Sequence, residues 1–334
     1  MPKPAWRQRA LRNPRVDGRL PRAANTIEHH VFLVSRLTPR DRWLAAMVHE
    51  HRVLTSTQIT QLAFPSERAT RARLRTLFQW SVLDRFQPFL TYGTAPMHYV
   101  LGPAGASILA AQHGFEVKDL GYRRERAFAI ANSLRLTHQV ATNDLLCRLA
   151  ATAPPGAAGL TCWWSETRCA RHLGDLVRPD AYARWNTTRA ELDAYLEIDL
   201  GTESLTQLAR KLPGYHDLAR ATGQVTQVLI WLPTARRETA ARRALHRTWT
   251  SLDDPSTVPL ATATPEPSCD PTGPVWLPLD SPGPRRSLDA LSSCWPQLST
   301  HAAASDTEAP APAGATVLLP PPAPRVPTLH PGRR

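Results

Sequence analysis

From about residue 160 the hydrophobic pattern changes from helical to alternating, and the resulting order of elements constrains the fold most strongly. The segments LTCWWSE, LVRPDAYARW and ELDAYLEIDL predict three successive strands. The segment ESLTQLARKL predicts a helix that Pro213 and Gly214 interrupt, and TQVLIWLP predicts a buried strand before a helix in ARRETAARRALHR. The segments STVPLATAT and GPVWLPL are compatible with added edge strands. Together with a helix expected over 131–153, this order predicts an α/β sheet with helices on its faces.

The stretch AYLEIDLGTES, residues 194–204, places two acids on one face of the third of these strands. Side chains alternate along a strand, so Glu197 and Asp199 point the same way. The opposite, apolar face would carry Leu196, Ile198 and Leu200. Two like charges about 7 Å apart repel each other unless something positive lies between them. A metal ion, an arginine such as Arg168 or Arg178, and water alone are the three alternatives.

Residues 37–114 predict a compact unit of helices with a hairpin. Thr38 and Pro39 are an N-cap and first helical residue for PRDRWLAAMVHEH, and Thr55 with Gln58 forms a capping-box pattern for a second helix. PSERATRARLRTLFQW predicts a third helix, SVLDRFQPF and PMHYVLG predict two strands, and PAGASILAAQHG predicts a closing helix. Three helices followed by a hairpin is the order of a winged helix-turn-helix, whose last helix enters the major groove of DNA.

Arginines at i, i+3 and i+7 of the third helix form a stripe separate from its apolar face. They are Arg68, Arg71 and Arg75. The chain has 334 residues and a formal charge of +12, and residues 1–90 hold 16 basic and 6 acidic residues. A basic excess concentrated around such a helix predicts contact with double-stranded DNA. The alternative is an exposed, solvated arginine face on an ordinary helix.

The rest of the chain divides by composition. Residues 1–36 are rich in Arg and Pro and predict a flexible basic arm, and residues 115–130 predict a charged linker. Residues 131–295 would form the sheet domain, and residues 296–334, rich in Pro and Ala, predict a disordered tail. The expected fold class is therefore a two-domain α/β (α+β) protein, with a winged helix-turn-helix before a mixed sheet flanked by helices.

Several protein classes do not match this sequence. Five cysteines without a CxxC pair predict reduced thiols in a cytoplasmic protein, and the spacing of Cys162, Cys169 and His172 fits no common zinc site. The longest apolar run near the N-terminus, VFLVS, is too short for a signal-peptide core or a membrane span. No GxxxxGK[ST] loop is present, which argues against an ATP-driven motor.

Acids around the strand pair, with a following lysine, have the chemistry of a metal-dependent nuclease. Asp180 ends the segment RPD, and Glu197 lies on the next predicted strand. Carboxylates are the oxygen ligands that Mg²⁺ prefers, and a lysine can orient water or offset phosphate charge. Lys211 lies on the helix that follows, although the residue after its neighbour Leu212 is a proline. A tyrosine nucleophile, Tyr195 or Tyr215, is a further alternative.

These residues resemble the PD-(D/E)xK nucleases, which have a restriction-endonuclease-like fold. RPD followed by an acid-x-acid strand carries the resemblance. The standard motif would place a lysine where this chain has Asp199, and Lys211 matches the position of members whose lysine has moved to the following helix. The resemblance implies Asp180, Glu197 and Lys211 as catalytic residues, and Asp180 and Glu197, with Asp199 as an auxiliary ligand, for Mg²⁺.

A second resemblance spans residues 36–290. LTPRDRWL, EHRVLTSTQI, WWSE, DLVRPDAYARW, LEIDLGTES and KLPGYHDL, in this order, are similar to the bacterial replication-relaxation family. The resemblance implies a role in plasmid or mobile-element replication and relaxation, together with other replication or mobilisation proteins. We therefore predict a DNA-binding protein with a Mg²⁺-dependent nicking site. The rival prediction is a non-catalytic winged-helix regulator or scaffold, and a homodimer is compatible with either.

Overall fold

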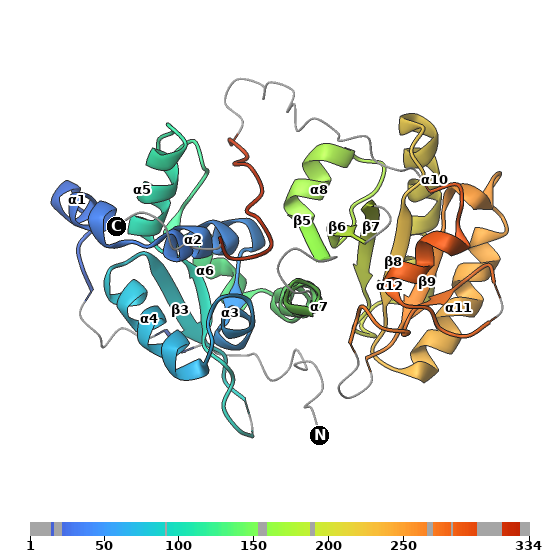
Figure 1. Ribbon diagram of the computed structural model, residues 1–334, viewed down its shortest axis with the longest axis horizontal. Helices are drawn as coiled ribbons and strands as arrows, with labels where there is room; N and C mark the ends of the chain where they lie inside the picture. The colour runs from blue at the N-terminus through green and yellow to red at the C-terminus, as the bar shows by residue number, and fades with distance from the viewer. Residues whose placement is uncertain are drawn as a thin grey trace. The chain divides into compact units, whose positions relative to one another are not determined.

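The computed structural model describes residues 15–16, 22–90, 92–152, 159–187, 191–265, 270–281, 283–298 and 316–327. These residues form two compact units (Figure 1). Within the described ranges, the N-terminal unit runs to residue 147 and includes residues 316–327, and the C-terminal unit comprises residues 148–298. No helix in these ranges is long and apolar enough to cross a membrane.

The helices of the N-terminal unit begin at the capping residues that the sequence predicts. They are α1 (Ile27–Arg36), α2 (Pro39–His51), α3 (Ser56–Ala63) and α4 (Glu67–Gln79). The side chain of Thr38 accepts a hydrogen bond from the Asp41 amide, and the Asp41 carboxylate accepts one from the Thr38 amide. The same reciprocal capping box joins Thr55 and Gln58 at the start of α3. The predicted start of both helices is therefore confirmed.

A small antiparallel sheet follows the helices. Its order is β1-β3-β4-β2, from β1 (Arg15–Val16), β3 (Leu83–Gln87), β4 (His98–Leu101) and β2 (Leu54–Thr55). The next helix is α5 (Pro103–Gln112). A Cβ on Gly102 or Gly105 would overlap the carbonyl oxygens of Ser81 and Val82, so glycine lets the start of α5 lie directly against that backbone. The predicted hairpin and closing helix are thus both present.

The first predicted boundaries differ from the structure. Residues 27–36, assigned to a flexible arm, form the helix α1, whereas most of residues 1–21 lie outside the described residues. The predicted linker contains α6 (Arg124–Ala129) and leads through η2 (Ile130–Asn132) into α7 (Leu136–Thr152). Ile130, Leu136 and Val140 pack with Val53 and Phe86 in one core. The boundary between the units therefore falls within α7, because these apolar residues complete the N-terminal core.

The predicted tail is also partly packed. Of residues 296–334, the structure describes 296–298 and 316–327. The amide of Val317 donates to the carbonyl of Asp119, and the carbonyl of Ala323 accepts a hydrogen bond of 2.6 Å from the Trp43 indole. Leu319 is 5% exposed. This segment is held by the N-terminal unit, since its backbone satisfies polar groups there and Leu319 is buried.

The C-terminal unit is built on a six-stranded sheet with the order β10-β9-β8-β7-β6-β5. The strands are β5 (Gly159–Ser165), β6 (Ala181–Asn186), β7 (Glu191–Ile198), β8 (Gln227–Trp231), β9 (Leu260–Ala263) and β10 (Leu277–Pro278). β5, β6 and β7 pair antiparallel, β7–β8 and β8–β9 pair parallel, and β10 returns antiparallel. The predicted mixed sheet is confirmed, although β9 lies inside it rather than at an edge.

Helices cover the face of this sheet that carries the acids. They are α9 (Leu205–Ala209), α10 (Lys211–Thr222) and α11 (Ala235–Trp249), and they pack over β8 through Leu212, Leu245 and Ile230 among others. The helix α8 (Glu166–Leu173) follows β5, so Glu166 begins a helix rather than ending a strand. On the opposite face, Trp276 packs against Trp231, with ring centroids 5.6 Å apart. Both faces of β7 and β8 are therefore buried.

Candidate functional site

Glu197 is the central carboxylate of the candidate site. It lies near the end of β7, on the helix-covered face of the sheet, and is only 2% exposed. The ammonium of Lys211 donates to one carboxylate oxygen, and the Tyr215 hydroxyl donates to the other at 2.5 Å. The side chain of Lys211 is 30% exposed, so the site reaches solvent at the lysine. A buried carboxylate is thereby presented beside an accessible cation.

Asp180 lies beside Glu197, directly before the first residue of the neighbouring strand. Ala181, where β6 begins, pairs with Leu196 in the antiparallel register, which puts Asp180 next to Glu197. The Asp180 carboxylate accepts a hydrogen bond of 2.8 Å from the amide of Ile198, and the Asp180 amide donates to the carbonyl of Leu196 at 3.1 Å. The backbone of β7 therefore fixes Asp180 next to Glu197, as expected for acids that share a strand pair.

The two acids share one lysine, and this has electrostatic consequences. Burial, followed by the charge of Asp180, raises the pKa of Glu197 to about 8, although Lys211 and Tyr215 act in the opposite direction. Burial opposes a charged lysine, but Glu197 and Asp180 together raise the pKa of Lys211. Glu197 and Asp180 therefore both act on the charge of Lys211. A proton on Glu197, or a cation bound beside it, would relieve the repulsion between the two carboxylates.

The start of α10 brings Lys211 and Tyr215 to Glu197. The break between α9 and α10 falls just before Lys211, and Pro213 lies in the first turn of α10, where its missing amide costs no helical hydrogen bond. Lys211 and Tyr215 are one turn apart and so share a helix face. A Cβ on Gly214 would overlap the carbonyl oxygen of Leu176, so glycine allows α10 to approach the segment before Asp180. The proline therefore does not move Lys211 away from the acids.

Asp199, predicted as an auxiliary ligand for Mg²⁺, is paired with an arginine. Arg237, in the first turn of α11, donates to its two carboxylate oxygens at 2.6 and 3.2 Å, and the Gly201 amide donates to it at 2.6 Å. Arg237 also donates to the carbonyl of Glu203. Asp199 is 1% exposed and fully engaged in this clamp. Glu197 and Asp199 share a face as predicted, but each is bound by its own cation.

The sequence model of the replication-relaxation family matches residues 46–230, which is more than half of the chain. The chain belongs to the replication-relaxation family. The match runs from α2 to β8 and therefore includes Asp180, Glu197 and Lys211. No curated protein and no solved structure matches the chain.

The residues of this replication-relaxation protein fit a magnesium ion by the chemistry of their donors. Mg²⁺ is commonly held by one or two carboxylates together with waters and substrate phosphates, and Asp180 and Glu197 provide two carboxylates on adjacent strands. Among the described residues, no group of three or more His, Cys, Asp or Glu side chains gathers as a metal site. Cys162, Cys169 and His172 are described and form no such group. Asp199, bound by Arg237, is oriented toward that arginine.

The arginine stripe of α4 is exposed as predicted. Arg68, Arg71 and Arg75 all lie on the solvent side of the helix. Among the described residues, their one ion pair joins Arg71 and Glu67 at 3.6 Å, and both side chains are more than two-thirds exposed. Arg73, between them in sequence, points inward and forms an ion pair with buried Asp41. The helix thus separates one structural arginine from three that remain available to a polyanion.

Two residues of the site were not assigned these roles from the sequence. Tyr215 was considered only as a nucleophile, although its position one turn after Lys211 indicates that both face Glu197. No local sequence pattern indicates that Arg237 pairs with Asp199, because the two residues are 38 positions apart in the sequence. Of the arginines suggested instead, Arg178 pairs with exposed Asp175. A tertiary contact of this kind depends on how α11 lies on the sheet.

Proposed function

We propose that the protein binds double-stranded DNA through a winged helix-turn-helix and acts in plasmid or mobile-element replication and relaxation. The proposal is supported by the element order α2, β2, α3, α4, β3, β4 and by the three exposed arginines of α4. In the C-terminal unit, the order β5, β6, β7, α10 and β8 agrees with the strands and helix expected of a restriction-endonuclease-like core. Membership of the replication-relaxation family is consistent with both.

The observation that carries a nuclease-type activity is the meeting of Asp180, Glu197 and Lys211. Asp180, just before β6, and Glu197, on β7, meet a lysine from the next helix, and both Asp180 and Lys211 are partly exposed. Arg237 binds the neighbouring Asp199, whereas the cation that contacts Glu197 is the partly exposed Lys211. Asp180 adds to the effect of burial in raising the pKa of Glu197, and a carboxylate perturbed in this way is typical of a functional site.

In this proposal Asp180 and Glu197 would hold a Mg²⁺ ion, which supplies electrostatic stabilisation of charge on a phosphate oxygen. Tyr215 keeps the Glu197 carboxylate in one orientation through its hydrogen bond. The partly exposed ammonium of Lys211 can donate to a phosphate oxygen or orient a water molecule. The first turn of α10 fixes both residues, because Gly214 allows it to lie against the segment before Asp180.

The test of this site is conversion of supercoiled plasmid in Mg²⁺ or Mn²⁺. The wild type should give nicked or linear DNA, and Glu197→Gln and Lys211→Met should each reduce the rate at least about 100-fold, the size typical of loss of one electrostatic catalytic group. Glu191→Gln is the matched control, because Glu191 begins the same strand and receives the same change. Equal product from the wild type and Glu197→Gln would reject the nuclease proposal.

A non-catalytic DNA-binding regulator is the second candidate. It is favoured by the internal pairing of Glu197 with Lys211 and Tyr215, and by Asp199 standing where the standard motif has lysine. In that case the C-terminal unit is a scaffold or a surface for another replication or mobilisation protein. DNA retention without cleavage, with or without divalent metal, would support this candidate.

DNA binding by α4 is tested separately from cleavage. Changing Arg68, Arg71 and Arg75 together to alanine should weaken duplex binding and flatten its salt dependence, because each phosphate contact contributes roughly 0.9 to the logarithmic slope. The control changes Arg123, Arg126 and Arg135, three other exposed arginines of the same unit. If both triple variants bind DNA equally well, the α4 stripe is only a solvated face.

A further inference from the structure

The outward face of α11 is a second arginine-rich surface. Arg236, Arg243 and Arg247 are exposed and follow one another at i, i+7 and i+11, which places them on one narrow stripe of the helix. His246 is exposed beside them. We refer to Arg236, Arg243 and Arg247 as the α11 stripe. The rise of 1.5 Å per residue spreads these three side chains over roughly 16 Å.

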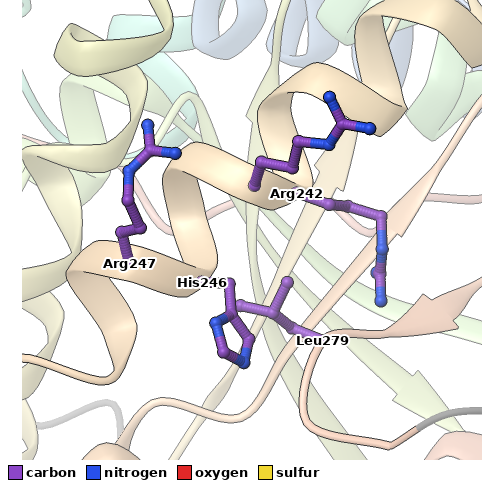
Figure 2. A pocket seen from close by; sticks show the side chains of 5 residues that line it. Arg242, His246, Arg247 and Leu279 are labelled. Carbon is purple, nitrogen blue, oxygen red and sulfur yellow. The ribbon is translucent and has the colours of Figure 1, made fainter.

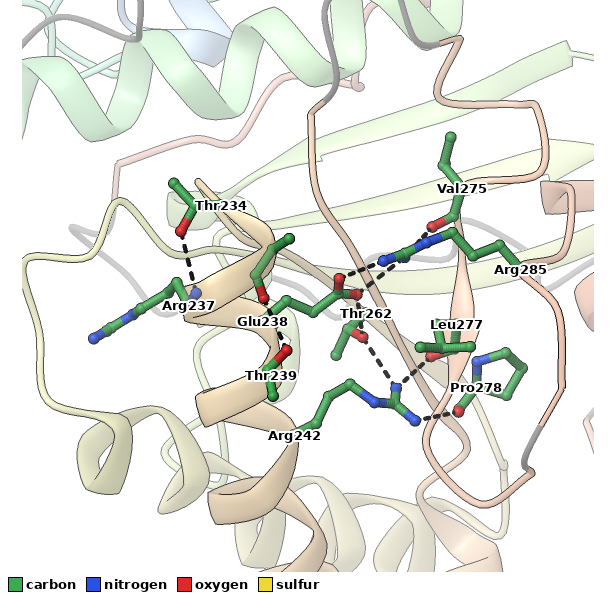
Figure 3. A network of polar contacts seen from close by, with 11 residues as sticks. Thr234, Arg237, Glu238, Thr239, Arg242, Thr262, Val275, Leu277, Pro278 and Arg285 are labelled. Atoms are coloured by element: carbon green, nitrogen blue, oxygen red, sulfur yellow. Dashed lines mark hydrogen bonds and ion pairs between the residues drawn. The ribbon is translucent and has the colours of Figure 1, made fainter.

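No acid balances the α11 stripe on its own helix. The only acid in α11 is Glu238, which is 3% exposed and turned toward the sheet. Arg285 donates to both Glu238 oxygens, at 3.1 and 2.5 Å, and the Thr262 hydroxyl donates at 2.7 Å (Figure 3). Within the part of the chain that the structure describes, no ion pair involves the three arginines of the stripe. Their charge is therefore presented to solvent.

A pocket lies beside the C-terminal half of the α11 stripe. Arg242, Arg243, His246, Arg247 and Leu279 line a pocket of about 440 Å³, and Figure 2 shows these side chains around it. Arg242 is fixed there by hydrogen bonds to the Thr262 hydroxyl and to the carbonyls of Leu277 and Pro278. The nearest acid in sequence to this lining is Asp280, whose carboxylate already accepts a hydrogen bond from the Trp295 indole. The pocket is thus cationic and held in shape by an immobilised arginine.

These features suit a chain of phosphates better than a single small anion. A nucleic acid strand carries one negative charge about every 3.4 Å of helix axis, so a row of cations about 16 Å long can meet several phosphates. Arginine offers a planar set of donors that matches phosphate oxygens. An acidic protein patch would also meet the charge, but Leu279 is the single apolar residue among those that line the pocket, whereas a protein interface has an apolar centre.

We propose that the α11 stripe and its pocket bind the phosphate backbone of DNA, as a nucleic-acid surface of the C-terminal unit. The surface is distinct from Arg68, Arg71 and Arg75 of α4, which belong to the other unit. It concerns binding alone and is independent of cleavage at Glu197. Arg237, adjacent to Arg236, ties the first turn of α11 to Asp199, so the stripe starts at the end of the strand that carries Glu197.

The experiment measures duplex DNA binding by fluorescence anisotropy over a series of salt concentrations, using the full chain. Changing Arg236, Arg243 and Arg247 together to glutamine should lower affinity at least about tenfold near 100 mM salt. The logarithmic salt slope should fall by roughly 2 to 3, one contact for each arginine. Since all three side chains are exposed, the melting temperature should stay within about 2 °C of the wild type.

Two comparisons make the result decisive. The control changes three other exposed arginines of the C-terminal unit, Arg171, Arg220 and Arg286, and removes the same charge. A second background carries the Arg68, Arg71 and Arg75 changes, in which the remaining DNA binding should disappear when the α11 stripe is also changed. Unchanged affinity and salt slope in the α11 variant overturn the inference, even if the α4 variant shows that DNA binding itself exists. A loss equal to that of the control overturns it as well.

Discussion

Two buried glutamates on the same face of the C-terminal sheet have opposite surroundings. The Glu238 carboxylate accepts hydrogen bonds from two guanidinium nitrogens of Arg285 and from the hydroxyl of Thr262. Arg285 also donates to the carbonyl of Val275, just before β10. The Glu197 carboxylate accepts hydrogen bonds from Lys211 and Tyr215, and a second acid, Asp180, is its neighbour. Glu238 is thus paired with a permanently charged arginine, whereas Glu197 is paired with a lysine and has its pKa raised by burial and by Asp180. The difference separates an acid that holds the fold together from an acid available for chemistry.

Three buried aspartates are also paired with arginines. Asp199 is bound by Arg237, Asp41 by Arg73, and Asp84 by Arg22 and Arg124. Arginine remains charged at any ordinary pH and matches a carboxylate with paired donors, so it suits permanent structural pairs. A lysine is a compact charge on a flexible stem that can turn toward a new ligand. Glu197, whose cation is a lysine, therefore differs from these arginine-paired acids.

The largest expected effect tests whether the Arg285–Glu238 pair stabilises the fold. Arg285→Met leaves Glu238 buried without its cation and should lower the free energy of unfolding by about 3 kcal/mol, near the lower end for broken buried pairs because Arg285 is partly exposed. Urea denaturation measures this loss. Arg286→Met, at the exposed neighbouring position, should change it by less than about 0.5 kcal/mol. Equal losses from both variants would mean that the Glu238 pair does not stabilise the fold.

The next effect tests the raised pKa of Glu197 through the pH dependence of stability, measured without divalent cations. Between its ordinary pKa of 4.5 and about 8, native Glu197 holds a proton that the unfolded chain has released, so this residue makes stability fall as pH rises through that window. Glu197→Gln should remove up to about 1.4 kcal/mol per pH unit of this slope. Urea denaturation at pH 5, 6, 7 and 8 compares the two proteins. Parallel pH profiles would contradict a raised pKa at Glu197.

The smallest effect sharpens the role of Tyr215. Tyr215→Phe removes one hydrogen bond to Glu197 and should cost about 1 kcal/mol of stability. Because that hydrogen bond lowers the pKa of Glu197, its loss should raise this pKa further and extend the sloping part of the pH profile to higher pH. The same denaturation series measures the shift. A profile displaced toward lower pH would show that Tyr215 does not stabilise the charged carboxylate.

Patterns close together in sequence predicted much of the fold. The capping boxes at Thr38 and Thr55 begin their helices as expected, because both partners lie within four residues. Alternation along β7 correctly put Glu197 and Asp199 on one face. Local periodicity likewise predicted the three strands, the helix and the further strand in their order along the chain, but it missed α8 between β5 and β6. Each of these features depends on short-range chemistry that a sequence displays directly.

Features that depend on packing were harder to predict. The stretch at 115–130 reads as a charged linker, yet α6 lies within it and the helices that follow supply apolar residues to the N-terminal core. Glu197 and Asp199 seemed compatible with an exposed face, but α10 and α11 bury both. The pairing of Asp199 with Arg237 depends on the placement of α11 on the sheet. The burial of these acids and the cations that they meet are properties of the whole fold.

Divalent-cation binding to the purified protein tests the central claim most directly. Isothermal titration with Mn²⁺ at pH 7.5 should show one site in the wild type and in Glu191→Gln, and at least about tenfold weaker binding in Glu197→Gln and Asp180→Asn. That result would establish the Asp180–Glu197 pair as a cation site, unlike the arginine-bound acids. Equal Mn²⁺ binding by all four proteins, or no binding by the wild type, would contradict the account and leave Glu197 as an internal partner of Lys211.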